Sequence, residues 1–157
     1  MKSTPWEVDN EKFSYEYIAG FLDGDGSIVA TLSKNPPHYN RIYRPRLKIN
    51  FSQKTYYISM LEALSKFLKS GKLRTNSKKQ LSELVITDRN DVLKILERIL
   101  PHLVIKKDRA QIALEILKLF GTNDKNNRIT DIKYNLIIQK IKLIRSLNSA
   151  SGGKKVI

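Results

Sequence analysis

The chain has 157 residues, 41% of them hydrophobic, which is enough for one globular domain with a sizeable core. Its 29 Lys and Arg residues outnumber 15 Asp and Glu residues, so the net charge is +14 and a polyanion is the expected partner. The absence of cysteine excludes a disulfide framework, a thiol nucleophile and the usual structural zinc sites, and the absence of a long apolar stretch excludes a membrane span.

Residues 1–12 are expected to form a flexible N-terminal arm, because they are polar apart from Trp6 and contain Pro5. They lack the apolar core of a signal peptide, so we expect an intracellular protein with no membrane partner. Ser14 can cap the first helix, which is predicted over about residues 14–24.

Two strands are predicted next, over residues 27–33 and 44–52, because apolar and polar side chains alternate strictly there. A loop that contains Pro36 and Pro37 joins them. In the second strand, one face is apolar and the other is basic. The side chains expected to point outward are Val29, Thr31 and Ser33 on the first strand, and Arg44, Arg46, Lys48 and Asn50 on the second.

Apolar residues at helical spacing predict a helix over residues 56–69, which stops at Gly71. A second hairpin follows, with strands 72–76 and 81–87, and its outward residues begin with Lys72, Arg74 and Asn76. Asp88 or Asn90 can cap another helix, whose end is set by Pro101.

Two more helices are predicted over residues 107–120 and 128–147, separated by a polar turn. Residues 149–157 are rich in Ser, Gly and Lys and are expected to form a flexible tail. Strand pairs alternating with helices, in the order αββαββα plus terminal helices, predict an α+β fold with helices stacked on one side of a sheet. No repeat or boundary is visible, so residues 13–148 are expected to form a single domain.

The stretch Tyr17–Ser27 reads YIAGFLDGDGS and combines small residues with a pair of carboxylates. The small residues leave one helix face bare, which would allow another helix to approach closely. A calcium loop is rejected, because its sixth position would be Ile28 and its twelfth Lys34. An isolated Asp-Gly pair is most often only a turn, but the whole stretch defines apolar, small and acidic positions together.

These residues resemble the LAGLIDADG motif of homing endonucleases, with Ile18–Gly26 in place of its nine letters. The segments Gln53-Lys54-Thr55 and 101–110 are similar to segments of the single-motif members. The resemblance implies a curved antiparallel four-stranded sheet that forms a saddle across double-stranded DNA, with helices on its other face. It also implies a site-specific endonuclease that uses Mg²⁺, for which Mn²⁺ or Ca²⁺ can substitute in binding.

The resemblance assigns roles to particular residues. Asp25 would be the metal ligand, with the carbonyl of Gly24 beside it, and Asp23 would be structural or a weak outer group. Lys106 would stabilise the phosphate or order the water, and Gln53 would orient the water network. Some members carry a basic residue where this chain has Tyr57. Each of these side chains could instead be ordinary surface, and the joint spacing with Asp25 is what favours the functional reading.

One copy of the motif implies a homodimer, because cutting both strands of a duplex needs two active sites. Its interface is expected to contain Ala19, Gly20, Leu22, Asp23 and Gly24. The target would be long and pseudo-palindromic, cut across the minor groove, and contacted by Val29, Thr31, Ser33, Arg44, Arg46, Lys48, Asn50, Lys72, Arg74 and Asn76.

Two other functions stay open at this point. Proteins of this fold can assist intron RNA splicing or act as DNA-binding regulators after losing cleavage, and the presence of both Asp25 and Lys106 favours the enzyme over these. A general RNA-binding domain gains little support, because the strands lack the aromatic pairs on which RNA bases stack.

Overall fold

The computed structural model describes residues 13–121 and 129–150, in the predicted order of elements. The elements are α1 (Tyr15–Asp25), β1 (Gly26–Lys34), β2 (Tyr43–Lys54), α2 (Ile58–Leu68), β3 (Lys72–Asn76), β4 (Leu81–Ile86), α3 (Arg89–Ile99), α4 (Lys107–Phe120) and α5 (Asp131–Ala150), with 3₁₀ turns at Thr55–Tyr57 and Leu100–His102. The expected N-terminal arm lies outside the described residues. So does most of the expected turn between α4 and α5. Because α5 continues to Ala150, the expected start of the tail at residue 149 is wrong, and residues 151–157 lie outside the described part.

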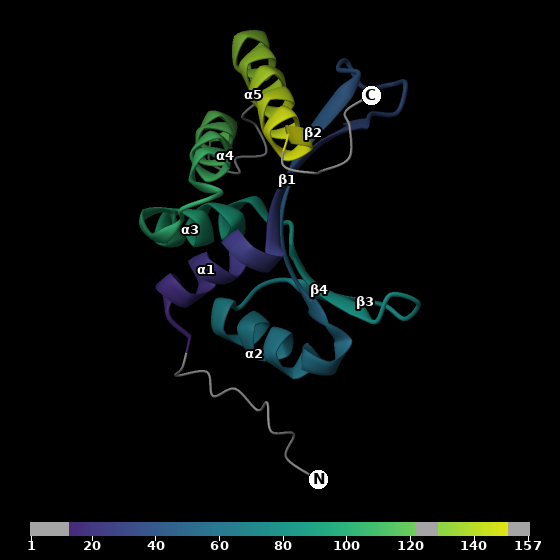
Figure 1. Ribbon diagram of the computed structural model, residues 1–157. Helices are drawn as coiled ribbons and strands as arrows, with labels where there is room; N and C mark the ends of the chain where they lie inside the picture. The colour runs from purple at the N-terminus through teal and green to yellow at the C-terminus, as the bar shows by residue number, and fades with distance from the viewer. Residues whose placement is uncertain (1–12, 122–128, 151–157) are drawn as a thin grey trace.

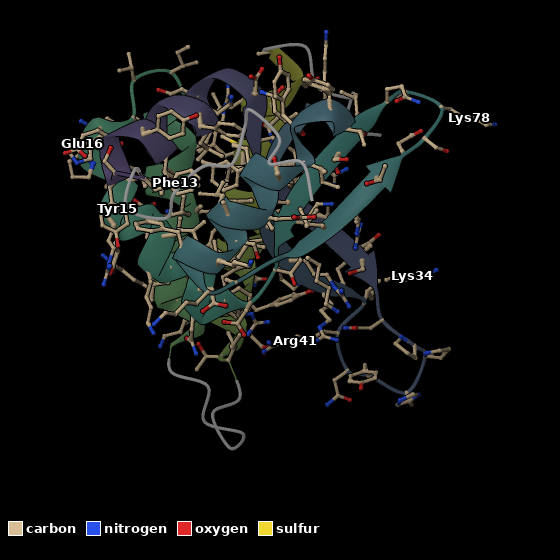
Figure 2. The ribbon with its side chains drawn as sticks, turned by 90° about the horizontal axis from the view of Figure 1, so that it is seen from below. Phe13, Tyr15, Glu16, Lys34, Arg41 and Lys78 are labelled. Atoms are coloured by element: carbon tan, nitrogen blue, oxygen red, sulfur yellow. The ribbon has the colours of Figure 1, made fainter. Side chains whose placement is uncertain are left out.

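The four strands form one antiparallel sheet in the order β1-β2-β4-β3. Strand β2 pairs with β1 over residues 43–51 and with β4 over residues 49–54, so the two hairpins extend from opposite ends of β2. The helices lie on one side of the sheet, and both hairpins bend away from them, which leaves the other face concave (Figure 1). Lys34 and Lys78, near the tips of the hairpins, lie far from Phe13 and Tyr15 (Figure 2).

The core lies between the apolar face of the sheet and the helices. The inward side chains of the strands are buried, as the alternation predicts, and they meet the apolar sides of α1, α2, α3 and α4. The fully buried large side chains include Ile28, Ile49, Phe51, Leu84 and Ile86 of the sheet and Leu22, Leu61, Leu96 and Ile116 of the helices. Burial of these groups supplies most of the driving force for folding.

Local capping explains where several helices begin and end. The Ser14 hydroxyl accepts a hydrogen bond from the Tyr17 amide at 3.1 Å, and the Asp88 carboxylate accepts one from the Asp91 amide at 3.0 Å. Helix α2 ends differently from the prediction. Lys69, with a φ of 53°, caps it in the left-handed conformation, and Gly71, with a φ of 100°, forms the turn into β3.

Helix α5, with 20 residues, packs against α4 and β1. Ile137, Ile141 and Ile144 form its buried side. The Asn148 side-chain amide donates a hydrogen bond to the Ile28 carbonyl of β1 at 2.9 Å. No helix in residues 13–121 or 129–150 is long and apolar enough to cross a membrane.

Candidate active site and nucleic-acid interface

Asp25 is the last residue of α1, and the chain passes from it directly into β1. This sharp junction depends on Gly26: a Cβ atom there would lie 2.6 Å from Leu22 Cδ1 and 2.7 Å from the Asn50 carbonyl oxygen. The junction leaves the Asp25 side chain exposed at the edge of the concave sheet. Glycine at position 26 therefore positions the carboxylate that the sequence singles out.

The structure brings all three expected catalytic residues to the C-terminal end of α1. The Gln53 side-chain amide, near the end of β2, donates to Asp25 Oδ2 at a long 3.4 Å. Lys106, which precedes α4, donates from Nζ to the carbonyls of Leu22 at 2.9 Å and Asp23 at 2.7 Å. These residues are 28 or more positions apart in the chain, so their proximity comes from the fold and not from a local turn.

Asp23 holds the segment that carries Lys106. Its carboxylate accepts hydrogen bonds from the backbone amides of Val104 at 2.8 Å, Ile105 at 3.3 Å and Lys106 at 2.9 Å. Burial alone would raise the pKa of this carboxyl, but the three backbone hydrogen bonds and the Lys106 charge outweigh it, so the pKa lies below its usual value. The structural role expected for Asp23 is thus visible as a clasp between α1 and the 103–106 segment.

The Lys106 ammonium occupies the negative end of the α1 dipole, where a cation is favourable. Burial lowers its pKa, and the Arg109 charge lowers it further, while Asp23 and Asp25 act in the opposite direction. An ammonium group has three donors, and two are given to the helix carbonyls. The third remains for a water or an anionic oxygen beside Asp25.

The donor atoms around Asp25 suit a hard cation that is only partly coordinated by protein. Within the described ranges, no three His, Cys, Asp or Glu side chains gather as a metal site. Asp25 offers a carboxylate, and Gly24 offers a carbonyl in the last helical turn, where carbonyls lack intrahelical partners. Both are oxygen donors at the negative end of a helix dipole, which fits Mg²⁺ or a similar ion that takes its remaining ligands from water and substrate.

Fewer small residues of α1 are exposed to solvent than the sequence predicts. Ala19 and Leu22 are fully buried in the chain's own core, so their expected placement on an exposed interface is wrong. Gly20 and Gly24 are exposed, and a Cβ atom at either position would have no neighbour within 4 Å. The exposed small-residue surface therefore consists of these two glycines, beside the partly buried Asp23.

The concave face of the sheet carries the outward side chains that the alternation predicts, with one exception. Arg44, Arg46, Thr31, Lys72, Arg74 and Asn76 are exposed, and Val29, Ser33 and Lys48 are partly exposed. Asn50 is only 8% exposed, because it lies between Ser27 and Val85 of the two neighbouring strands in the middle of the sheet. Its expected role as a surface contact is wrong.

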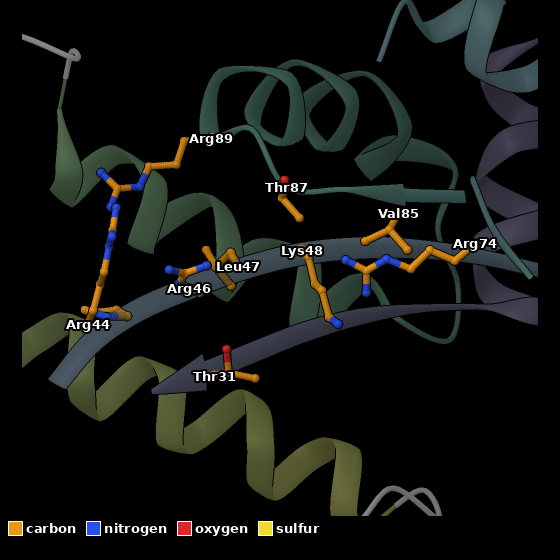
Figure 3. A pocket seen from close by; sticks show the side chains of 10 residues that line it. Thr31, Arg44, Arg46, Leu47, Lys48, Arg74, Val85, Thr87 and Arg89 are labelled. Carbon is orange, nitrogen blue, oxygen red and sulfur yellow. The ribbon is translucent and has the colours of Figure 1, made fainter. Parts of the chain in front are cut away.

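Arg89, at the start of α3, is a basic residue of this face that sequence reasoning missed. A hollow of about 330 Å³ on the concave face is lined by Thr31, Arg44, Pro45, Arg46, Leu47, Lys48, Arg74, Val85, Thr87 and Arg89 (Figure 3). The sequence could have indicated Arg89 by its position, because it follows the last predicted strand directly, where a helix begins at the edge of the sheet. Tyr57, which takes the place of a basic residue of some single-motif members, packs its ring edge-on against that of Tyr56, with centroids 5.1 Å apart.

Known proteins resemble this chain in sequence. Residues 18–104 match the LAGLIDADG endonuclease family. The DNA endonuclease I-CvuI of Chlorella vulgaris is 27% identical over 109 residues, which cover 69% of this chain and 66% of the relative. The DNA endonuclease I-CreI of Chlamydomonas reinhardtii is 29% identical over 112 residues, which cover 69% of this chain and 67% of the relative. The chain thus spans about two thirds of the length of these relatives.

Solved structures confirm the expected fold. The crystal structure of I-CvuI with the I-CreI target superimposes with a TM-score of 0.72 at 25% identity, over 91% of this chain and 85% of that one. The archaeal intron-encoded homing endonuclease I-Vdi141I, complexed with DNA, gives a TM-score of 0.76 at 16% identity, over 94% of this chain and 90% of that one. The α+β saddle and the single motif are therefore those of a known class, and the chain belongs to the LAGLIDADG endonuclease family.

Proposed function

We propose that this chain is a site-specific double-strand DNA endonuclease that acts as a homodimer on a long pseudo-palindromic target and uses Mg²⁺. The observation that supports this best is the meeting of Asp25, Gln53 and Lys106 at the end of α1, on the edge of a basic concave sheet. The relatives I-CvuI and I-CreI are DNA endonucleases, and I-CvuI has been crystallised with its target in the presence of Ca²⁺.

Cleavage of a phosphodiester requires that negative charge on the phosphate be stabilised while a water attacks. Asp25 and the Gly24 carbonyl would hold Mg²⁺, which when bound supplies positive charge at the phosphate. Gln53 holds the Asp25 carboxylate and can orient a neighbouring water. Lys106 keeps a further positive charge beside the same carboxylate, fixed by its two bonds to α1.

A homodimer would provide the second active site, and the exposed face of α1 fits such an interface. Glycine inside a helix destabilises it by about 0.5–1 kcal/mol relative to alanine, and no contact with the described part of the chain requires glycine at position 20 or 24. Close approach of a second helix explains both. Exposed apolar side chains lie next to this face, since Val104 and Ile105 are 82% and 65% exposed and their amides bind Asp23.

The decisive experiment is incubation of the purified chain with Mg²⁺ and a randomised duplex library, followed by sequencing of the ends produced. The Mg²⁺ concentration should be varied, because I-CvuI with the I-CreI target in 2 mM Mg²⁺ was found with DNA not cleaved. We expect one long motif with approximate two-fold symmetry. Random ends, or ends in one strand only, would contradict a site-specific dimer.

Asp25→Asn should abolish cleavage and leave affinity for the same duplex nearly unchanged, because the amide keeps the shape of the carboxylate but is a poor magnesium ligand. The measurement is single-turnover cleavage together with binding in Ca²⁺. Asp108→Asn, an exposed carboxylate at the start of α4, is the control. Cleavage by Asp25→Asn at near the wild-type rate would remove Asp25 from the mechanism, and site-specific binding without cleavage by the wild type would favour a DNA-binding regulator.

A further inference from the structure

Two arginines from distant parts of the chain meet at one end of the hollow on the concave face. Arg44 belongs to β2, and Arg89 is the first residue of α3. Figure 3 shows their side chains extending toward each other, with the guanidinium groups adjacent. The proximity is also felt electrostatically: burial lowers the pKa of Arg89, and the Arg44 charge lowers it further.

Arg89 is fixed in this position by an aromatic support. Its guanidinium carbon lies 3.8 Å from the ring centroid of Phe120, at the end of α4. This geometry is a cation–π contact, and it holds the side chain without neutralising its charge. The planar group is therefore presented to the hollow in a defined orientation.

Among the described residues, neither arginine has an acidic partner to balance its charge. The ion pairs formed within residues 13–121 and 129–150 involve other basic groups, and the adjacent Asp88 carboxylate is engaged as the cap of α3. Two like charges at close range repel each other, and the repulsion is relieved when an anion lies between them. Guanidinium groups match the oxygen geometry of phosphate and can share one phosphate between two forks.

We propose that Arg44 and Arg89 together bind one backbone phosphate of the DNA duplex at the end of the hollow, so that Arg44 positions the DNA and does not read a base. This inference rests on the proposed function. Arg46, Lys48 and Arg74 line the rest of the same hollow, where base edges would lie. A neutral base edge would leave the charges of the arginine pair unbalanced, which is why a phosphate is the better ligand.

Salt dependence of binding separates these two kinds of contact. Arg89→Ala and Arg44→Ala should each weaken binding to the cleaved site and to a mixed-sequence duplex by the same factor, about tenfold or more at low salt. The slope of log affinity against log salt should become shallower by about two units, one for each protomer. Arg46→Ala should instead lower discrimination at one position of each half-site.

Two matched variants control the experiment. Lys94→Ala removes the same charge from an exposed position of α3 outside the hollow, and its slope should equal that of the wild type. Phe120→Leu keeps both arginines but removes the ring, so it should weaken both duplexes alike by a smaller factor. Thermal denaturation of each variant confirms that it is folded.

An unchanged slope and affinity for Arg89→Ala, with the wild type binding normally, would overturn the phosphate assignment alone. A loss confined to one base position would overturn it as well, in favour of base reading. A wild-type chain that binds no duplex would overturn the proposed function and the phosphate site with it. Binding by the wild type is measured first, so the two failures are distinguished.

Discussion

Asp23 and Asp25 are two residues apart at the end of one helix, yet their surroundings differ completely. The Asp23 carboxylate receives three backbone amides of the 103–106 segment, whereas the exposed Asp25 carboxylate receives one long hydrogen bond from Gln53. The alternation of direction along the last helical turn therefore assigns one acid to structure and leaves the other available for a ligand. The resemblance implied different roles for the two residues, and the metal-binding role of Asp25 stays a prediction.

Asp23→Asn should destabilise the fold by about 1–2 kcal/mol at neutral pH, because an amide cannot accept all three backbone hydrogen bonds. The pKa of Asp23 is lowered below 3.8 in the folded chain, so the stability it provides is present above pH 3.8 and is lost as the pH falls through the folded value. Urea unfolding of variant and wild type should therefore differ at neutral pH and converge in acid.

Glu97→Gln, at an exposed position of α3, is the control for loss of one negative charge and should leave stability unchanged. Asp23→Asn should also loosen the 103–106 segment, and faster hydrogen exchange of the Val104 and Lys106 amides would report this. Equal stability of Asp23→Asn and wild type at neutral pH would show that the clasp contributes nothing.

The sequence predicts the location of a side chain well where its position along a helix or strand decides that location. It predicts exposure poorly where packing against other elements decides it. Asp25, Gln53 and Lys106 converge as expected. Ala19 and Leu22 are buried because the core surrounds α1 on more sides than a small-residue pattern reveals. Asn50 has the outward phase of its strand, but central strands of a curved sheet are covered by neighbouring side chains, which alternation alone does not show.

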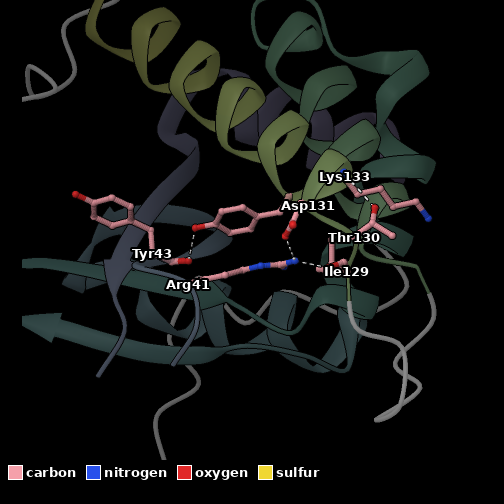
Figure 4. A network of polar contacts seen from close by, with 7 residues as sticks. Arg41, Tyr43, Ile129, Thr130, Asp131 and Lys133 are labelled. Carbon is pink, nitrogen blue, oxygen red and sulfur yellow. Dashed lines mark hydrogen bonds and ion pairs between the residues drawn. The ribbon is translucent and has the colours of Figure 1, made fainter. Parts of the chain in front are cut away.

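At the scale of elements, α5 braces the hairpin formed by β1 and β2. Arg41, in the hairpin loop, donates to the Ile129 carbonyl and lies 3.3 Å from the Asp131 carboxylate (Figure 4). Its guanidinium carbon lies 4.5 Å from the ring centroid of Tyr134, whose hydroxyl donates to the Tyr43 carbonyl at 2.8 Å. With Asn148 bound to Ile28, the helix is fastened to β1 and β2 near both of its ends.

Tyr134→Phe should increase local opening of this hairpin, because it removes the hydrogen bond to Tyr43 but keeps the ring beside Arg41. The expected loss is about 0.5–1.5 kcal/mol of local stability, and Tyr134→Ala should lose more. The measurement is hydrogen exchange of the Asn35 amide, which is bonded to the Ile42 carbonyl at 2.8 Å. Tyr39→Phe, in the same loop but 58% exposed, is the control. Unchanged exchange in both Tyr134 variants would show that α5 does not brace the hairpin.

The elements themselves were largely predictable because their signals are local. The apolar stripe of α3, its Asp88 cap and Pro101 define that helix within the sequence, and strict alternation defines β1 and β2. The brace was not predictable, since Arg41 and Asp131 are 90 residues apart and a single arginine in a loop has no distinctive pattern. The same reason explains why Arg89 and its contact with Phe120 were missed.

At the scale of the whole molecule, a saddle with one active site needs a partner to cut two strands, and α1 is the element that would join the two copies. The face of α1 that we propose as the interface combines two glycines that no contact with the described residues requires with exposed apolar groups, of which Tyr17 is 51% exposed and Val104 is 82% exposed. A pairing through this face would bring the two Asp25 side chains close together. Dimerisation and catalysis would then depend on the same helix.

Gly20→Leu should convert the dimer to a monomer, because a leucine side chain cannot fit where two helix backbones touch. The isolated chain should remain folded, since a Cβ atom at this position meets nothing within 4 Å and leucine favours the helix over glycine. Sedimentation should therefore show a monomer, and thermal denaturation should show that this monomer is folded. Double-strand cleavage should be lost. Gln139→Leu adds the same side chain to an exposed position of α5 and should remain dimeric. An intact dimer of the Gly20→Leu variant would move the interface away from α1, and the second active site would then have to be brought to the DNA by another surface.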